Sequence, residues 1–331
     1  MKDFEQLDER LPRDQYWPLP DATGPCGGER RVGVEIEFAG LSEAMAAKSL
    51  ADVFGGRLVR YDAHVWKLED SQIGTLKIEL DTALKNKAGS PIGDQLLELS
   101  RELVPVEVVT SPLSAGDLCE MDRLLKHLQS AGALGSRDGL LFGFGIHLNP
   151  EVAAETAEHI IPVVRAFALV EQCLRAVDPP DTARRILPFI DPWPRSFMDR
   201  VVTEGTDWQL GALCDAYLEL VRSRNHGLDL LPLLEHLMPD RVRAGLPEGH
   251  AKGGRATWHY RLPETKFDAE NWSFAYEWNR WVFVERVAQD SSVLRRLSAA
   301  WAAHRASRTS IRTDWSHDAC AILLGADLWD A

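Results

Sequence analysis

The sequence predicts an α+β fold, with a mainly antiparallel sheet, helices on one side of it and a helical C-terminal half. Short segments in which apolar and polar residues alternate, as in half-buried strands, fall almost entirely within the first 150 residues. Two of these segments are separated by a short loop, which is typical of a hairpin. After residue 150 the apolar residues recur at helical spacing. Strands in hairpins with segregated helices indicate an α+β architecture.

Alternation predicts six strands, at residues 31–40, 64–70, 75–81, 104–110, 140–150 and, as a short last strand, within 249–264. The second and third form the hairpin, with residues 71–74 as its loop. Glycines in the strand at 140–150 indicate close approach by another backbone or a ligand.

Helices are predicted at residues 42–56, 91–103 and 115–133. The first has Ser42 as its N-cap and Gly55-Gly56 as its stop. Along the chain we expect an irregular leader (1–28), a strand-rich part (29–150), a helical region (151–248) and a final part (249–331) that returns a strand and ends in helices.

Composition and charge narrow the functional classes. The 331 residues include 45% hydrophobic and 26% charged side chains, with a formal net charge of -13. Nucleic-acid binding needs a basic surface, so we expect no nucleic-acid partner. No apolar run approaches the roughly 18 residues that span a bilayer, and the start has no signal-peptide core, so we expect no membrane partner. The five cysteines have irregular spacing and predict reduced thiols in a cytoplasmic protein.

The strands carry an unusual set of acidic residues. Glu35 and Glu37 share one face of an otherwise apolar strand and lie roughly 7 Å apart. The same geometry recurs in Glu79 and Asp81, and Glu107 is the only polar residue between the apolar ones of another strand. In the glycine-rich strand, His147 and Asn149 share a face.

If these faces converge, clustered carboxylates are costly without a cation, because like charges raise one another's pKa. Oxygen ligands with few imidazoles suit Mg²⁺ or Mn²⁺ better than zinc. The alternative is that each strand has one solvated face. Because four strands share the pattern, we favour the metal site.

Several of these segments resemble, in order, the amidoligase family, whose members are related to glutamine synthetase and glutamate–cysteine ligase. The resembling segments are "VGVEIEFAGL", "FGG", "EDSQIGTLKIELD", "VEVVTSPL", "LQSAGALG", "FGFGIHLNPE" and "HYRLPETKFDAENWSF". The resemblance implies a glutamine synthetase-like fold, with residues 29–150 as the N-terminal part of a ligase catalytic domain and 249–331 returning a catalytic strand. It also implies a ligase that consumes ATP with divalent cations, Mg²⁺ or Mn²⁺.

Carried onto this chain, the resemblance assigns metal ligation to Glu35, Glu37, Glu79, Asp81, Glu107, His147 and His259. His147 and Asn149 match the nucleotide-side strand, Arg261 the arginine that contacts phosphate, and Glu107 and Arg261 are the catalytic candidates. One residue departs from the pattern, because His259 stands where the family usually has Glu.

Two further assignments have structural alternatives. Asp70 and Ser71 contact substrate by family analogy, or turn the hairpin. Thr265 either contacts the phosphates or caps a turn.

The predicted function is ATP- and Mg²⁺-dependent formation of an amide or peptide bond through an acyl phosphate. Two alternatives stay open: a catalytically silent nucleotide- or peptide-binding protein of the same fold, which His259 favours, and a metal-dependent hydrolase. The expected partners are a small-molecule or peptide carboxylate and an amine. The sequence names neither substrate, nor the oligomeric state.

Overall fold

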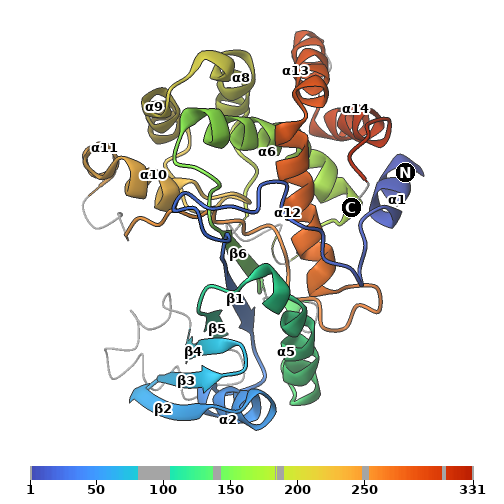
Figure 1. Cartoon of the computed structure of the whole chain (residues 1–331). Coiled ribbons are helices and arrows are strands. Elements are labelled where there is room, and N and C mark those ends of the chain that lie inside the picture. Colours follow the sequence, from blue (N-terminus) through green and yellow to red (C-terminus); the bar gives the residue numbers. More distant parts are fainter. Residues whose placement is uncertain are drawn as a thin grey trace.

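A six-stranded sheet forms the lower half of the molecule in Figure 1. The computed structural model describes residues 2–80, 105–136, 143–182, 184, 190–247, 253–307 and 311–329. The strands are β1 (Val32–Phe38), β2 (Arg57–Asp62), β3 (Val65–Ser71), β4 (Gly74–Leu80), β5 (Val106–Thr110) and β6 (Ile146–Pro150). Their order is β2-β3-β4-β5-β1-β6, and every neighbouring pair is antiparallel, which confirms the expected antiparallel sheet.

The two faces of this sheet differ because its side chains alternate. In β1, Val34 and Ile36 are fully buried, whereas Glu35 and Glu37 on the other face are only partly buried. The apolar face shares its core with α2 (Glu43–Phe54) and α5 (Cys119–Ser130). We call the opposite face, which carries Glu35 and Glu37, the polar face.

Helix α2 begins and ends where the sequence predicts. The hydroxyl of Ser42 accepts a hydrogen bond from the backbone N–H of Met45 at 3.2 Å, as an N-cap does. At the other end Gly55 has φ +64°, a conformation that glycine adopts without strain.

The helical half packs against the end of the sheet where β1 and β6 lie (Figure 1). Its helices are α6 (Ala157–Val177), α8 (Arg195–Thr203), α9 (Leu210–Leu220), α10 (Leu231–Leu237), α11 (Pro239–Gly245), α12 (Phe274–Gln289), α13 (Ser291–Ala306) and α14 (Arg312–Leu324). Helix α6 is central, because α8, α12 and α14 all pack on it. One continuous hydrophobic core runs from the sheet into these helices. Among the described residues, none of the helices has both the length and the apolar character that crossing a membrane requires.

Several elements differ from the sequence-based expectation. Lys2–Glu9, within the expected irregular leader, forms helix α1, which packs on α14 and buries Leu7. Strand β2 was not predicted, because its Arg-Leu-Val-Arg-Tyr-Asp sequence is mostly exposed and lacks an apolar alternation. The predicted four-residue loop of the hairpin is wrong: Ser71 pairs with Gly74, which leaves two residues in the turn. The predicted helix at 91–103 lies outside the described residues.

The predicted sixth strand at 249–264 is not a regular strand. Residues 257–264 instead run beside β6 as an extended segment joined to it by isolated bridges. Leu148 and Tyr260 exchange both backbone hydrogen bonds at 2.9 Å. This segment, which we call the edge segment, therefore extends the sheet without satisfying the pattern of a full strand.

The prediction that all five cysteines are reduced thiols is wrong. Cys173 in α6 and Cys320 in α14 form a disulfide, and both are fully buried. Their spacing along the chain gave no indication of pairing, because 147 residues separate them. The disulfide removes the cysteine-based argument for a cytoplasmic location.

Candidate functional site

Three carboxylates form a row across the polar face. Glu37 of β1 lies directly opposite Glu107 of β5, and Glu107 lies opposite Glu79 of β4. Side chains directly opposite one another in an antiparallel sheet have Cβ atoms about 5 Å apart, so these carboxylates are neighbours. Glu37 is fixed by the backbone N–H of Gly145, which donates to its Oε2 at 2.8 Å. The row gathers negative charge on a partly buried surface, where like charges repel unless a cation lies between them.

Glu35 lies one row away, beside β6. His147 is its cross-strand partner, and the Nδ1 of His147 lies 3.0 Å from Oε2 of Glu35. The side-chain amide of Asn149 donates to Oε1 of Glu35 at 3.0 Å. Burial by itself favours the neutral acid, but the hydrogen bond and the charge of His147 outweigh it and hold the pKa of Glu35 well below its usual range. Glu35 is therefore an ionised carboxylate in a fixed orientation.

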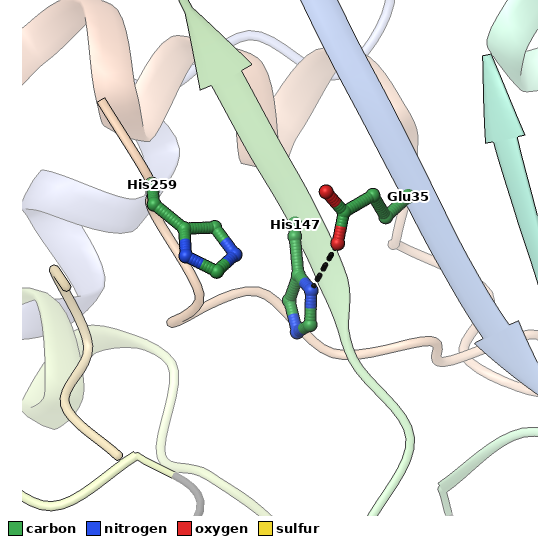
Figure 2. Close-up of side chains that lie close together, drawn as sticks. All are labelled: Glu35, His147 and His259. Atoms are coloured by element: carbon green, nitrogen blue, oxygen red, sulfur yellow. Dashed lines mark hydrogen bonds and ion pairs between the residues drawn. The ribbon is translucent and has the colours of Figure 1, made fainter. Parts of the chain in front are cut away.

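His259 reaches the same place from the edge segment (Figure 2). Tyr260 pairs with Leu148, whose side chain belongs to the apolar face, so its neighbour His259 lies on the polar face. The rings of His147 and His259 meet edge to face, with centroids 5.3 Å apart. Burial lowers the pKa of His259, although the hydrogen bond of Asp229 and the charge of Glu35 oppose that shift. A neutral imidazole is the form that binds a metal.

The donor atoms fit a divalent cation. In the described part of the chain, two groups of residues bring one potential ligand atom each to within 4.8 Å of one another: Glu35 with His147 and His259, and Glu37 with Glu107 and His147. The Nε2 atoms of both histidines are buried and have no hydrogen-bond partner among the described residues. A buried nitrogen without a partner is costly, and a metal ion removes that cost. These residues would hold such an ion through carboxylate oxygens and imidazole nitrogens.

A cavity of about 320 Å³, within the size range of small-molecule sites, is lined by three members of these groups, Glu35, Glu107 and His259. Its acidic and imidazole side chains come from the polar face and the edge segment, and its basic side chains are Lys77, Arg224 and Arg255. Lys77 forms an ion pair with Glu79, and Arg255 lies 4.0 Å from Glu35. Arg255 is mostly exposed, with 68% of its side chain accessible. The cavity thus combines carboxylate and imidazole side chains with basic groups that suit an anionic ligand.

The structure brings most of the predicted site residues together. The polar face and the edge segment unite Glu35, Glu37, Glu79, Glu107, His147, Asn149 and His259. Asp81, the remaining predicted metal ligand, lies outside the described residues.

Three predicted residues have positions that suit structural roles. Thr265 is fully buried, and its hydroxyl donates to the carbonyl oxygen of Glu37 at 2.8 Å. Ser71 closes the hairpin turn, because its hydroxyl donates to the carbonyl oxygen of Gly74 at 2.5 Å. Asp70 precedes it with φ +56°. These contacts fit the turn role for Asp70 and Ser71, and Thr265 ties the chain just beyond the edge segment to β1. Contact of these residues with substrate or phosphate stays a prediction.

Arg261 lies two residues beyond His259 on the edge segment. Its Nη1 donates to the carbonyl oxygen of Arg224, and its Nε has no partner among the residues described. Its backbone N–H donates to the carbonyl oxygen of Gly227 at 2.8 Å. The guanidinium is therefore held from one side and keeps a donor for a ligand.

Two buried residues near the site were missed by sequence reasoning. Arg184 is 2% exposed, donates through Nη2 to the carbonyl oxygen of Arg261 at 3.0 Å, and is close enough to Glu37 for their charges to interact. A Cβ at Gly145 would lie 2.9 Å from this Nη2. The guanidinium thus approaches the backbone closely at a glycine, although the sequence predicted a backbone or a ligand there. Asp229 is fully buried behind His259. Nothing in the sequence marks Arg184 as a site residue. Asp229 could have been noticed, because it is a lone carboxylate in the apolar run "LDLLPLL".

Comparisons with known proteins add one finding. A family model described as "Putative amidoligase enzyme" matches residues 28–283, which includes the polar face, the helical region and the edge segment. No curated protein and no solved structure matches the chain.

Proposed function

The chain belongs to the amidoligase family, and on this premise we propose that it joins a carboxylate to an amine at the expense of ATP, through an acyl phosphate. The observation that carries the proposal is the convergence of Glu35, Glu37, Glu107, His147 and His259 on one face, where three of them line a cavity that also has basic side chains. Phosphoryl transfer needs both kinds of group, because catalysis there consists mainly of positioning the reactants and neutralising charge.

In the first step a carboxylate oxygen of the substrate attacks the γ-phosphorus of ATP. The bond from that phosphorus to the bridging oxygen breaks, and ADP leaves with the electron pair. Divalent cations, when bound, supply charge neutralisation for the phosphate oxygens. The chain's own cations, Lys77 and Arg255 at the cavity and Arg261 beside His259, attract and orient the phosphates. The planar fork of arginine suits the oxygens of a transferred phosphoryl group.

In the second step the amine attacks the acyl carbon, and phosphate leaves. The amine arrives protonated near neutral pH and must lose one proton before it attacks and a second as the amide forms. A carboxylate on the polar face can accept a proton, and Glu107 is the candidate because it lies at the middle of the carboxylate row. An acidic surface also favours the binding of the ammonium form, because their charges attract.

The silent-protein alternative rests on His259, since this residue lacks the charge of the usual glutamate. The position of His259 weakens that argument. Its Nε2 has no partner among the described residues and lies in the same group as Glu35 and His147, so the site keeps a donor atom at this position.

The test uses hydroxylamine, a small nucleophile that intercepts acyl phosphates, so that only the carboxylate needs to be searched for. The full chain is incubated with Mg²⁺–ATP, hydroxylamine and a panel of amino acids, short peptides and dicarboxylic acids. We expect a hydroxamate together with one equivalent of ADP and of phosphate. AMP and pyrophosphate, or ATP hydrolysis that no carboxylate stimulates, would contradict the acyl-phosphate mechanism.

Two substitutions calibrate this assay. Glu107→Gln should reduce hydroxamate formation at least 100-fold, because it removes a charge from the middle of the row. Glu120→Gln, on the opposite side of the sheet in α5, is the matched control and should retain activity. Similar activity in both variants would remove Glu107 from the site.

A further inference from the structure

We propose that Glu35, His147 and His259 form a site selective for a first-row transition-metal ion such as Zn²⁺, in preference to Mg²⁺, with Asp229 as the positioning residue that orients His259. The inference deepens the proposed function and rests on it only for the role of the site in nucleotide chemistry. Its structural basis is the pair of imidazoles on one cation position.

The donor set favours this class of metal. Mg²⁺ prefers six oxygen ligands in a small octahedron and keeps several waters, whereas imidazole nitrogen suits zinc, cobalt, iron and copper. The group contains two imidazoles and one carboxylate, all with a ligand atom within 4.8 Å of the others. The group formed by Glu37, Glu107 and His147 has instead two carboxylates and one imidazole. The two neighbouring positions therefore differ in their preference, and the one with His259 is richer in nitrogen.

Asp229 fixes the tautomer of His259. Its Oδ2 lies 3.2 Å from Nδ1 of His259, so this nitrogen carries the proton and Nε2 presents its lone pair. A carboxylate behind a ligating histidine is the arrangement that orients the ring and increases its basicity. The unpartnered Nε2 is on the side of the ring that faces away from Asp229, towards the group with Glu35 and His147.

Asp229 is itself held rigidly. Its side chain is fully buried, Oδ2 also accepts from Nε of Arg224 at 2.9 Å, and Oδ1 accepts from the backbone N–H of Leu231 at 2.9 Å. The backbone N–H of Asp229 donates to the carbonyl oxygen of His259 at 3.0 Å, so the two residues are joined by main chain and side chain. Such a carboxylate costs free energy to bury, and a role in positioning a metal ligand accounts for its presence.

The test measures metal binding directly in the full-length protein after chelator treatment. Co²⁺ is the probe, because its visible absorption reports nitrogen ligation and coordination number, and Zn²⁺ and Mg²⁺ are added as competitors. We expect one equivalent of Co²⁺ with an intense visible spectrum, displaced by stoichiometric Zn²⁺ and resistant to a large excess of Mg²⁺.

Three variants locate the site. His259→Glu should weaken Co²⁺ binding at least 10-fold and strengthen Mg²⁺ binding, which reverses the selectivity. Asp229→Asn should weaken Co²⁺ binding about 10- to 100-fold through loss of the orienting carboxylate. The ratio of the Co²⁺ to the Mg²⁺ affinity is the decisive readout, because a purely structural loss would weaken both. His236→Gln, at an exposed ion pair with Glu155, is the control and should behave as wild type.

An unchanged affinity ratio in His259→Glu, or a wild-type Co²⁺ spectrum typical of oxygen ligands alone, would overturn the inference. Binding of Mg²⁺–ATP is measured separately. Selective Co²⁺ binding without nucleotide binding would support the metal site and contradict the proposed ligase. Hydroxamate formation with no preference for a transition metal would support the proposed ligase and contradict the transition-metal site.

Discussion

Two clusters of buried charge draw on the same short stretch of chain. His259 belongs to the polar face, whereas Glu264 and Lys266, a few residues later, belong to a network with Asp178, Glu277 and Arg280. In that network positive and negative groups alternate: Lys266 lies 2.5 Å from Asp178 and 3.4 Å from Glu264, and Arg280 lies 2.7 Å from Glu277. On the polar face, by contrast, carboxylates lie opposite carboxylates, and the Nε2 atoms of His147 and His259 have no hydrogen-bond partner among the described residues, with Oε1 of Glu37 lying 3.8 Å from that of His147.

The first cluster supports the fold, whereas the arrangement of the second fits our proposal of a ligand site. The network joins the edge segment to α6 and α12, and only Nε of Arg280 is without a partner in its guanidinium group. Each of its three carboxylates has a cationic nitrogen within 3.4 Å. On the polar face Glu37 and Glu107 instead lie opposite one another, an arrangement expected of a binding site for cations. Each prediction below tests one side of this contrast.

The largest expected effect is on the network. Arg280→Met should lower the free energy of unfolding by about 3–5 kcal/mol, because it leaves the fully buried Glu277 without its cation, while Asp178 keeps its ion pair with Lys266. Chemical denaturation measures the change. Arg295→Met, which removes an exposed arginine from α13, is the control and should change stability little. A loss below 1 kcal/mol for Arg280→Met would mean that the network is not a structural cluster.

The disulfide gives the next effect. Replacing Cys320 by Ala should cost about 2–4 kcal/mol, since the bond no longer restricts the unfolded chain between α6 and α14. Because neither cysteine lies in the cavity lining, Co²⁺ and nucleotide binding should be unchanged under conditions where the variant is folded. Cys214→Ala, at a free buried thiol, controls for loss of packing. If the Cys320→Ala variant is as stable as Cys214→Ala, the disulfide contributes nothing to the free energy of unfolding.

The two glutamates of β1 should respond with opposite signs. In metal-free protein, Glu37→Gln should raise stability by about 1 kcal/mol, or a few degrees in Tm, because the repulsion from Glu107 is removed. The amide oxygen of the new side chain can still accept from the backbone N–H of Gly145, and the imidazole nitrogen near Glu37, Nε2 of His147, lies 3.8 Å away, beyond hydrogen-bond distance. Glu35→Gln should lower it by about 1–2 kcal/mol, because Glu35 accepts hydrogen bonds from His147 and Asn149. Glu37→Gln should lose the stabilisation that Mg²⁺–ATP gives the wild type, and Glu35→Gln should lose the stabilisation that Zn²⁺ gives it. Thermal melts in chelator, in Mg²⁺–ATP and in Zn²⁺ measure this, and a wild-type response in both variants would contradict the metal site.

The smallest expected effect is the pH dependence of the stability difference between wild type and Glu35→Gln. The pKa of Glu35 lies below its ordinary value of 4.5 in the folded protein. A carboxyl group with a lowered folded pKa contributes stability that is fully present above the unfolded value and is lost as the pH falls through the folded one. The stability advantage of wild type over Glu35→Gln should therefore be constant above about pH 5.5 and shrink below 4.5. Denaturation at several pH values tests this, and a gap that widens in acid would show that the sign is wrong.

The sequence by itself determined the antiparallel sheet, its apolar face and most of the polar face. Alternation in β1 and β4 is a local property, and a period of two assigns Glu35, Glu37 and Glu79 to faces without knowledge of neighbouring strands. The same rule treats Glu35 and Glu37 as equivalent. Only the register shows that one faces His147 and the other Glu107, because cross-strand partners are fixed by pairing between distant segments.

Tertiary structure alone decided the remaining features. Arg184, Asp229 and the Cys173–Cys320 pair belong to the helical half, where the sequence shows mainly core-forming periodicity, and folding brings each to a partner far along the chain. His259 shows both what the sequence determined and what only the tertiary structure decided. Its neighbour Arg261 identified the segment by resemblance, but its bond to Asp229 and its contact with His147 depend on how the edge segment lies beside β6. Side-chain periodicity encodes which face a residue occupies, whereas the partner it meets is set by packing between segments that the sequence does not place together.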